Sequence, residues 1–293
     1  MQGLVVGNIA DLYKVEFEDN IYGCHSRGKL KKDGNSLTVG DLVEFEIENK
    51  DKKIGIINEI YERRIYIKRP KISNISQLIL VVSSKNPKPD LLMLDKQLAF
   101  AEFKKIMPII VLNKLDLDDK KQFEGIRNIY EKIGYKVILT EGKTGLGVDN
   151  LKNYLRNNIN AFSGNSGVGK STLINQIFQF NITEEGEISK RNKRGKNTTT
   201  NSTLYKIDKN TYIADTPGFS TFSIDEIESK ELEKYFIEIF ENKDLCEFVG
   251  CSHIKEQNCN IKKLVETEKI NISRYNNYCK IYNELKNREG KKW

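Results

Sequence analysis

The stretch Gly164-Asn165-Ser166-Gly167-Val168-Gly169-Lys170-Ser171-Thr172 decides the fold of this chain. It fills the pattern G-x-x-x-x-G-K-[ST], in which backbone N–H groups of a glycine-rich loop point at the phosphates of a nucleotide. The lysine adds positive charge at the β- and γ-phosphates, and the serine hydroxyl can hold Mg²⁺. The sequence therefore predicts a phosphate-binding loop whose nucleotide-binding residues run from Gly164 to Thr172.

The residues on both sides of the loop support this prediction. A short apolar segment precedes it, and Leu173, Ile174, Ile177 and Phe178 recur at helical spacing after it. A glycine–serine turn that carries Lys-Ser by chance is the alternative. Such a turn requires neither the strand nor the helix, so the surroundings favour the phosphate loop.

A second recognition motif, Asn113-Lys114-Leu115-Asp116, follows a buried-strand pattern at residues 109–112. In GTP-binding proteins the N-K-x-D box reads guanine, because the Asp carboxylate accepts hydrogen bonds from the N1–H and 2-amino groups of the base. Adenine offers no matching donors and would leave the carboxylate unpaired. Alone, these residues would also suit a helix-capping turn. At a strand end in the domain of a phosphate loop, they favour guanine binding through Asn113, Lys114 and Asp116.

The two motifs stand in the reverse of their usual order. Ordinary GTPases place the phosphate loop first and the guanine box late, whereas here Asn113 precedes Gly164. Strands that are distant in sequence can be neighbours in a sheet, and chain termini often lie close together. The order therefore indicates a circularly permuted α/β GTPase domain, which we expect to span residues 69–222.

Two segments after the phosphate loop are candidates for sensing the γ-phosphate. Residues 184–200 are polar, and Thr199 among them can offer a hydroxyl to Mg²⁺. A basic run at 190–196 would suit either RNA or a solvated loop. The second segment follows a strand pattern, and in it Asp215 can orient the water shell of the metal while the Gly218 N–H contacts the γ-phosphate.

The N-terminal residues 1–68 have the pattern of short alternating strands with glycines between them. This pattern favours a small all-β, OB-like barrel. Such barrels often bind nucleic acid, and one predicted loop is basic. Its basic residues are Arg27, Lys29, Lys31 and Lys32. An RNA-binding loop and a merely solvated charged loop suit this segment equally well.

Four candidate metal ligands lie close together near the C-terminus: Cys246, Cys251, His253 and Cys259. The chain has five cysteines, and an odd number without a secretory leader argues against a disulfide framework. Three thiolates and one imidazole make a closed tetrahedral set, which is typical of one structural Zn²⁺ ion. Buried cysteines without a metal are the alternative. We expect residues 223–293 to form a helical zinc-binding domain.

The composition predicts a soluble, multidomain protein. The 293 residues carry a formal charge of +7, which permits an anionic partner without proving one. The most apolar run, at residues 78–82, is too short to cross a membrane, and charged residues interrupt the N-terminal apolar stretch. We therefore expect a cytoplasmic location, no membrane partner and a monomer.

These motifs together resemble the circularly permuted GTPases called ribosome small-subunit-dependent GTPase A (RsgA). The resemblance covers essentially the whole chain, from the barrel through both nucleotide motifs to the zinc ligands. It implies a late-stage assembly factor of the small ribosomal subunit that contacts its rRNA. It also implies that this subunit stimulates hydrolysis of Mg²⁺-bound GTP to GDP, which accompanies release of another maturation factor.

One position departs from the family that the chain resembles. The family has a proposed catalytic histidine before the threonine run, whereas this chain has Asn197. Asparagine can hydrogen-bond a water molecule but cannot take its proton. Phe219 stands where many GTPases place a water-orienting glutamine. We therefore expect slow hydrolysis that depends on the ribosome.

Two other functions remain as alternatives from the sequence. One is a nucleotide-gated RNA-binding switch with negligible intrinsic hydrolysis, which multiple-turnover assays with small subunits would distinguish. The other is a P-loop kinase, which would bind ATP and need a site for a phosphoryl acceptor. Asp116 argues against the kinase, because its carboxylate matches guanine.

Overall fold

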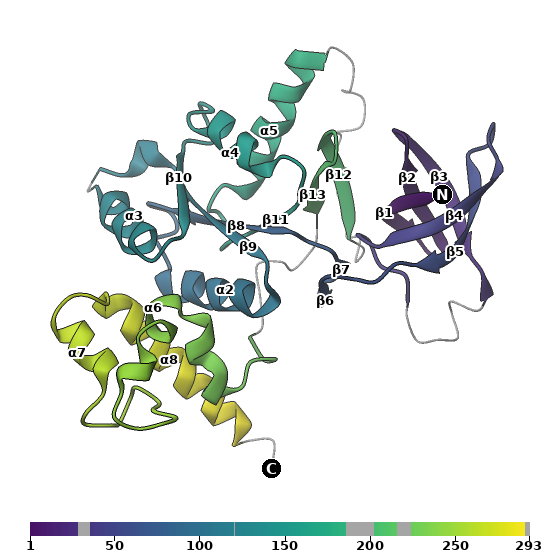
Figure 1. The fold of residues 1–293 in the computed structure, drawn as a ribbon. Helices are drawn as coiled ribbons and strands as arrows, with labels where there is room; N and C mark the ends of the chain where they lie inside the picture. The colour runs from purple at the N-terminus through teal and green to yellow at the C-terminus, as the bar shows by residue number, and fades with distance from the viewer. Residues whose placement is uncertain (29–35, 120, 186–201, 216–223, 291–293) are drawn as a thin grey trace. The chain divides into compact units, whose positions relative to one another are not determined.

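The computed structural model describes residues 1–293 except 29–35, 120, 186–201, 216–223 and 291–293 (Figure 1). The chain forms two compact units, each made of several stretches of sequence. The first contains residues 1–79, 142–163 and 170–220, and the second contains residues 80–141, 164–169 and 221–293. The glycine-rich loop, the guanine-type box and the predicted zinc ligands therefore belong to the second unit.

The first unit begins with a closed barrel of five strands. These strands are β1 (Gln2–Ile9), β2 (Leu12–Phe17), β3 (Asn20–Ser26), β4 (Leu42–Asn49) and β5 (Ile54–Ile60). They pair in the order β1-β2-β3-β5-β4, and β4 closes the barrel by pairing with β1. The β3–β5 pair is parallel, while the other pairs are antiparallel. The predicted OB-like barrel is confirmed.

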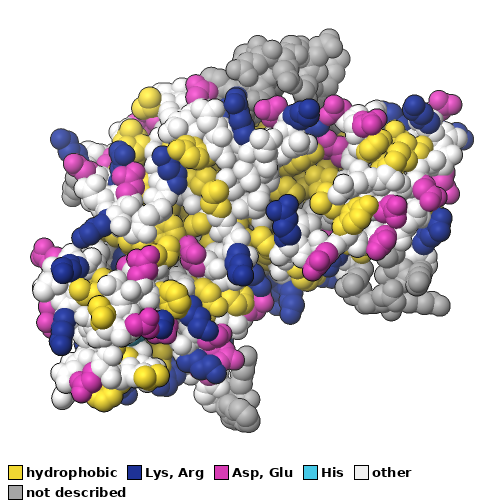
Figure 2. Space-filling view, viewed as in Figure 1, with side chains coloured by type: hydrophobic (Ala, Val, Ile, Leu, Met, Phe, Trp, Pro, Cys, Tyr) yellow, Lys and Arg dark blue, Asp and Glu magenta, His cyan; other side chains and the backbone are white. Residues whose placement is uncertain are grey.

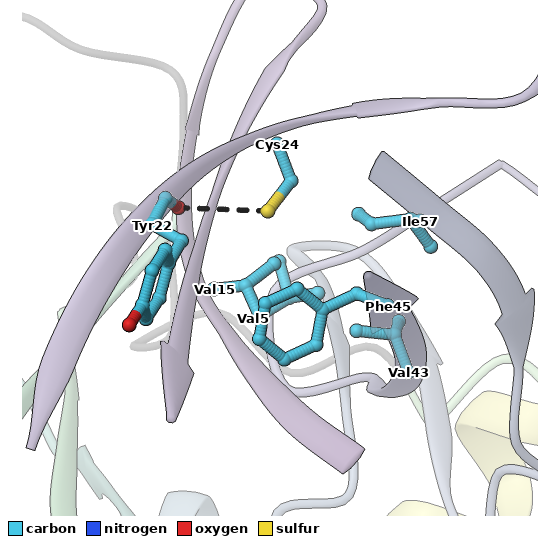
Figure 3. Close-up of a cluster of buried hydrophobic side chains, with 7 residues drawn as sticks. All are labelled: Val5, Val15, Tyr22, Cys24, Val43, Phe45 and Ile57. Atoms are coloured by element: carbon cyan, nitrogen blue, oxygen red, sulfur yellow. Dashed lines mark hydrogen bonds between the residues drawn. The ribbon is translucent and has the colours of Figure 1, made fainter. Parts of the chain in front are cut away.

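Alternating residues of the strands fill the barrel, because successive side chains of a strand point to opposite faces. The buried cluster consists of Val5, Val15, Tyr22, Cys24, Val43, Phe45 and Ile57 (Figure 3). Phe45 packs edge-on against Phe17, with ring centroids 5.7 Å apart. Burial raises the pKa of the Cys24 thiol to about 11, because desolvation penalises the thiolate. Cys24 therefore packs as a small apolar residue.

A buried carboxylate fastens the barrel to the hairpin of β6 (Tyr66–Lys68) and β7 (Lys71–Ser73). Arg63 donates to both carboxylate oxygens of Asp41, at 2.7 and 2.8 Å. Ser73 Oγ donates to the same carboxylate at 2.6 Å. Because its charge is paired and hydrogen-bonded, Asp41 can be fully buried. The hydrogen bond from Ser73 to Asp41 therefore holds the hairpin against the barrel.

The first unit also contains part of the predicted α/β region. Its elements are α4 (Val148–Leu155), β11 (Ile159–Ser163), α5 (Lys170–Glu185), β12 (Thr203–Asp208) and β13 (Thr211–Asp215). β11 pairs in parallel with β13, and β13 pairs antiparallel with β12. Lys206 of β12 lies 2.6 Å from the carboxylate of Glu16 on β2, so the barrel contacts these strands within the unit.

The second unit contains parallel strands and their connecting helices. Along the chain these are β8 (Gln77–Ser83), α2 (Leu91–Lys104), β9 (Met107–Asn113), η1 (Leu115–Leu117), α3 (Gln122–Lys132) and β10 (Lys136–Thr140). β9 pairs in parallel with β10 and neighbours β8, which enters the unit at residue 80. All seven residues of β8 are buried, which explains its continuous apolar run.

The C-terminal helices belong to the same second unit. They are η2 (Ser229–Tyr235), α6 (Ile237–Phe240), η3 (Lys243–Leu245), α7 (Asn260–Glu266) and α8 (Ile272–Glu289). Arg274 of α8 lies 2.6 Å from the Asp95 carboxylate of α2 and 2.7 Å from that of Glu238. Asn277 and Tyr130 also donate to Asp95, each at 2.7 Å. A buried, fully paired charge network thus joins α8 to α2.

The surface gives two further observations. In the part of the chain that the structure describes, no helix combines the length and the apolar character that a membrane span requires. On the face shown in Figure 2, Lys and Arg side chains lie among Asp and Glu side chains. The positive net charge is therefore not gathered into one patch on that face.

Candidate functional site

Three glycines of the phosphate loop have left-handed backbone angles. φ is +139° at Gly164, +82° at Gly167 and +99° at Gly169. A Cβ added at Gly164 would lie 2.2 Å from the Val81 carbonyl oxygen, and one at Gly169 would lie 2.3 Å from Asn113 Nδ2. Only glycine suits both this backbone and this space. The glycines therefore allow the loop to lie directly against β8 and the end of β9.

Asn113 joins the guanine-type box to the phosphate loop. It is the last residue of β9 and is 1% exposed. Its Nδ2 donates to the Val168 carbonyl at 2.9 Å, and its Oδ1 accepts from Thr140 Oγ1 at 3.0 Å. Thr140 ends the neighbouring strand β10 and is fully buried. The structure thus brings together two motifs that the chain presents in reversed order.

Lys114 of the box contacts the segment that follows β8. Ser84 Oγ donates to the Lys114 carbonyl at 2.8 Å, and Lys114 Nζ donates to the Asn86 carbonyl. Lys114 has a φ of +66°, which turns the chain from β9 into η1. Asp116 lies in η1 and is exposed, so the base of a nucleotide can reach its carboxylate from solution.

Sequence reasoning missed the contribution of residues 85–90 to this site. Asn165 Nδ2 lies 3.3 Å from Asp90 Oδ2. Asp90 also caps α2, because its side chain accepts from the Met93 N–H at 2.9 Å. A signal for this segment was present in the sequence. Polar residues and two prolines follow a buried strand directly, and ligands of α/β sheets bind at the carboxyl ends of strands.

Lys170, Ser171 and Thr172 belong to the first unit and begin α5 directly after Gly169 in the chain. Ser171 and Thr172 are exposed, and Lys170 is half-buried. Burial lowers the pKa of Lys170, because desolvation penalises the ammonium group. Bound phosphates would favour the charged form, so phosphate binding and protonation of Lys170 would support each other.

Of the four predicted catalytic residues, the structure describes Asp215. It is the last residue of β13, in the first unit, and it is exposed. Asn197, Thr199 and Gly218 lie outside the described residues, as does the basic run at 190–196. The roles of these residues in catalysis and RNA binding stay predictions.

The four predicted metal ligands lie together in the second unit. The ligand atoms of Cys246, Cys251, His253 and Cys259 are all within 4.8 Å of one another. Cys246 Sγ is 3.9 Å from Cys259 Sγ, and His253 Nδ1 is 3.6 and 3.4 Å from these two sulfurs. Tetrahedral zinc, with Zn–S bonds of about 2.3 Å, sets sulfurs about 3.8 Å apart and sulfur and nitrogen about 3.5 Å apart. The cluster could therefore hold one zinc ion.

Burial favours the protonated form of two of these thiols, and a bound metal would reverse that preference. Burial raises the pKa of Cys251 to about 12 and also raises the pKa of Cys259, because desolvation penalises a thiolate. A divalent metal reverses this preference, since its charge stabilises the coordinating thiolates. Cys279, the remaining C-terminal cysteine, lies on α8 and is not a member of the cluster.

Comparison with known proteins agrees with this geometry. The family model of the RsgA N-terminal domain matches residues 2–57, and the RsgA GTPase model matches residues 60–225. The small ribosomal subunit biogenesis GTPase RsgA of Clostridium novyi (strain NT) is 40% identical over 294 aligned residues, which cover 100% of each chain. The chain belongs to the RsgA GTPase family.

Two solved structures are similar over nearly the whole chain. YjeQ from Thermotoga maritima has a TM-score of 0.84 at 34% identity, covering 97% of this chain and 98% of its own. YloQ, a circularly permuted GTPase, has a TM-score of 0.83 at 32% identity, covering 98% of this chain and 95% of its own. The predicted architecture of an OB-like barrel and a permuted P-loop GTPase domain is confirmed.

Thr140→Val tests the support of Asn113. The substitution keeps the shape of the side chain but removes the hydroxyl that donates to Asn113 Oδ1. Because an unmade buried hydrogen bond costs about 1–3 kcal/mol, we expect GTP to bind about 5- to 150-fold more weakly in titration calorimetry. The control is Thr144→Val, since the Thr144 hydroxyl accepts from the Leu146 N–H in an exposed loop. Equal affinity in Thr140→Val and wild type would contradict the role given to Thr140.

Proposed function

We propose that this chain is a GTPase that binds the small ribosomal subunit and hydrolyses GTP during late maturation of that subunit. The observation that carries the proposal is the 2.9 Å hydrogen bond from Asn113 Nδ2 to the Val168 carbonyl. It joins a guanine-type box to a phosphate loop. Membership of the RsgA family supports the choice of partner, because the relative from Clostridium novyi is named a small ribosomal subunit biogenesis GTPase.

In the proposed complex, the motifs recognise different parts of the nucleotide. The N–H groups of residues 164–169 bind the phosphates, Lys170 adds positive charge, and Ser171 is a ligand for Mg²⁺. The Asp116 carboxylate accepts hydrogen bonds from guanine. Because Asn113 ties the box to the loop, a ligand must match both ends at once, which favours GTP and GDP over ATP.

Hydrolysis requires that water attack the γ-phosphorus while GDP leaves, so the protein must position the water and neutralise the developing charge. We propose that Asn197 positions the attacking water and that the Gly218 N–H binds the γ-phosphate. Thr199 and Asp215 would hold Mg²⁺ and its water shell. Neither Asn197 nor Phe219 can take a proton from water. A group supplied by the small ribosomal subunit would complete the site.

The cysteine–histidine cluster holds one structural zinc ion in this proposal. Four protein ligands leave no open position for a substrate, so the ion stabilises the fold around residues 246–259. This part of the chain and the barrel loop after Arg27 are the proposed rRNA contacts. We also propose that the protein is a cytoplasmic monomer and that its GTP hydrolysis accompanies release of another maturation factor.

A second candidate is a nucleotide-gated RNA-binding switch with negligible hydrolysis. The observation that favours it is the presence of Asn197 and Phe219, because neither side chain can act as a base toward water. Both candidates bind GTP at the same site. They differ in whether one chain turns over many GTP molecules when small subunits are present.

GTP turnover with and without purified small ribosomal subunits tests the proposal. We expect slow basal turnover and stimulation on the order of 10²-fold or more, which is the effect of one well-placed catalytic group. Lys170→Ala is the control, because it removes charge at the phosphates. Binding of GTP without multiple turnover in the presence of subunits would select the switch instead.

Asn197→His tests whether a missing base limits the basal rate. An imidazole near the attacking water can take its proton, so we expect basal turnover to rise on the order of 10²-fold. The rate should increase with pH through about 6.5, because the neutral form of histidine is the base. The control Asn197→Gln keeps an amide and should stay slow. Unchanged turnover of Asn197→His, with and without subunits, would show that this side chain is not the missing group.

A further inference from the structure

The two ring nitrogens of His253 have different partners. Nδ1 faces the thiols, at 3.4 Å from Cys259 Sγ and 3.6 Å from Cys246 Sγ. Nε2 lies 2.9 Å from Oε2 of Glu233, a residue outside the ligand cluster. The histidine side chain is 1% exposed, so water competes little for either nitrogen. The ring therefore lies between the thiols and a carboxylate.

This arrangement selects one tautomer of the imidazole. A neutral imidazole binds a metal through one nitrogen and carries its proton on the other. An ionised carboxylate only accepts hydrogen bonds, so the contact with Glu233 requires the proton on Nε2. The lone pair of Nδ1 is then free to bind a metal among the sulfurs. The opposite tautomer would direct an N–H group at that position.

Glu233 comes from outside the loops that carry the ligands. It lies in η2, which is anchored in the second unit by buried Leu232 and followed by buried Phe236. The backbone of His253 has a separate support, because the Tyr275 hydroxyl donates to its carbonyl at 2.7 Å. The contact with Glu233 therefore acts on the ring of His253, separately from the support of its backbone.

We propose that Glu233 is a positioning residue of the zinc site, holding His253 in its metal-binding tautomer and thereby tying η2 to the metal. The inference rests on the zinc ion of the proposed function. Carboxylate partners of metal-bound histidines increase ligand basicity, and their loss lowers metal affinity about 10- to 100-fold. The contact therefore connects the metal ligands to η2, an element outside the loops that carry them.

Zinc affinity of the full chain, measured by competition with a chromophoric chelator, gives the first test. We expect Glu233→Ala to bind zinc about 10- to 100-fold more weakly. Glu233→Gln should lose less, since its amide oxygen still accepts from Nε2. The control Glu231→Ala removes a carboxylate of the same element that pairs with Lys234 at 2.7 Å, and it should bind zinc as the wild type does.

The outcomes separate this inference from the proposed function. A wild-type chain that binds no zinc would overturn the zinc site itself. A wild type that binds zinc, with Glu233→Ala binding equally tightly, would overturn only the role of Glu233. If Glu233→Ala does not fold, Glu233→Asp decides in the same way, because it keeps the charge but withdraws the acceptor from Nε2 by one methylene group.

Nitrogen NMR of the zinc-loaded chain, labelled at histidine, observes the tautomer directly. The chain has two histidines, and exposed His25 on β3 provides the reference signal. We expect a protonated Nε2 and a metal-bound Nδ1 for His253 in the wild type and in Glu233→Gln. In Glu233→Ala, a metal on Nδ1 still leaves the proton on Nε2, but this N–H has lost its acceptor and should exchange with water faster than in the wild type. Unchanged exchange of the Nε2 proton would overturn the proposal.

Discussion

The hydrogen bond from Asn113 to the Val168 carbonyl is the contact on which the proposed function depends. It connects the end of β9 with the phosphate loop. A side chain at position 169 would clash with Asn113, so the contact requires Gly169. Thr140 supports it by donating to the other end of the same amide. A parallel sheet brings the ends of β9 and β10 to one edge, so these contacts need no particular order of the motifs along the chain. This is why a permuted sequence can still build a guanine-nucleotide site.

The phosphate loop and the C-terminal helices both contact α2 within the second unit. At its beginning, Asp90 caps the helix and lies 3.3 Å from Asn165 of the loop. Further along, Asp95 pairs with Arg274 of α8 at 2.6 Å. Both charges are buried, so separating α8 from α2 would break their ion pair and leave Asp95 without its charged partner. The cysteine–histidine cluster therefore belongs to the same unit as the phosphate loop, and the contact from His253 to Glu233 links the cluster to η2 within this unit.

Features that depend on local pattern were predictable from the sequence. The glycines of the loop, the N-K-x-D box and the spacing of Cys246 to Cys259 each carry their chemistry in a short stretch, and alternation predicted the barrel. The remaining contacts join residues that are far apart in the sequence, and no periodic pattern of residues marks them. The sequence around Arg274 does not distinguish it from an exposed arginine on a helix, yet its side chain is buried against Asp95. Glu233 is one of several acidic residues in its segment, and only the fold reveals that it contacts His253.

Nucleotide titration of the wild type and of Asp116→Asn tests whether Asp116 and the phosphate loop form one guanine-nucleotide site. Xanthine has an oxygen where guanine has its 2-amino group, so an asparagine amide can donate to xanthine while it cannot accept both guanine donors. We expect the wild type to prefer GTP to ATP and to xanthosine triphosphate by about 10²-fold or more, and Asp116→Asn to prefer xanthosine triphosphate. A wild type that binds ATP as well as GTP, or a variant that keeps full affinity for GTP, would contradict a guanine site built from Asn113, Asp116 and the phosphate loop.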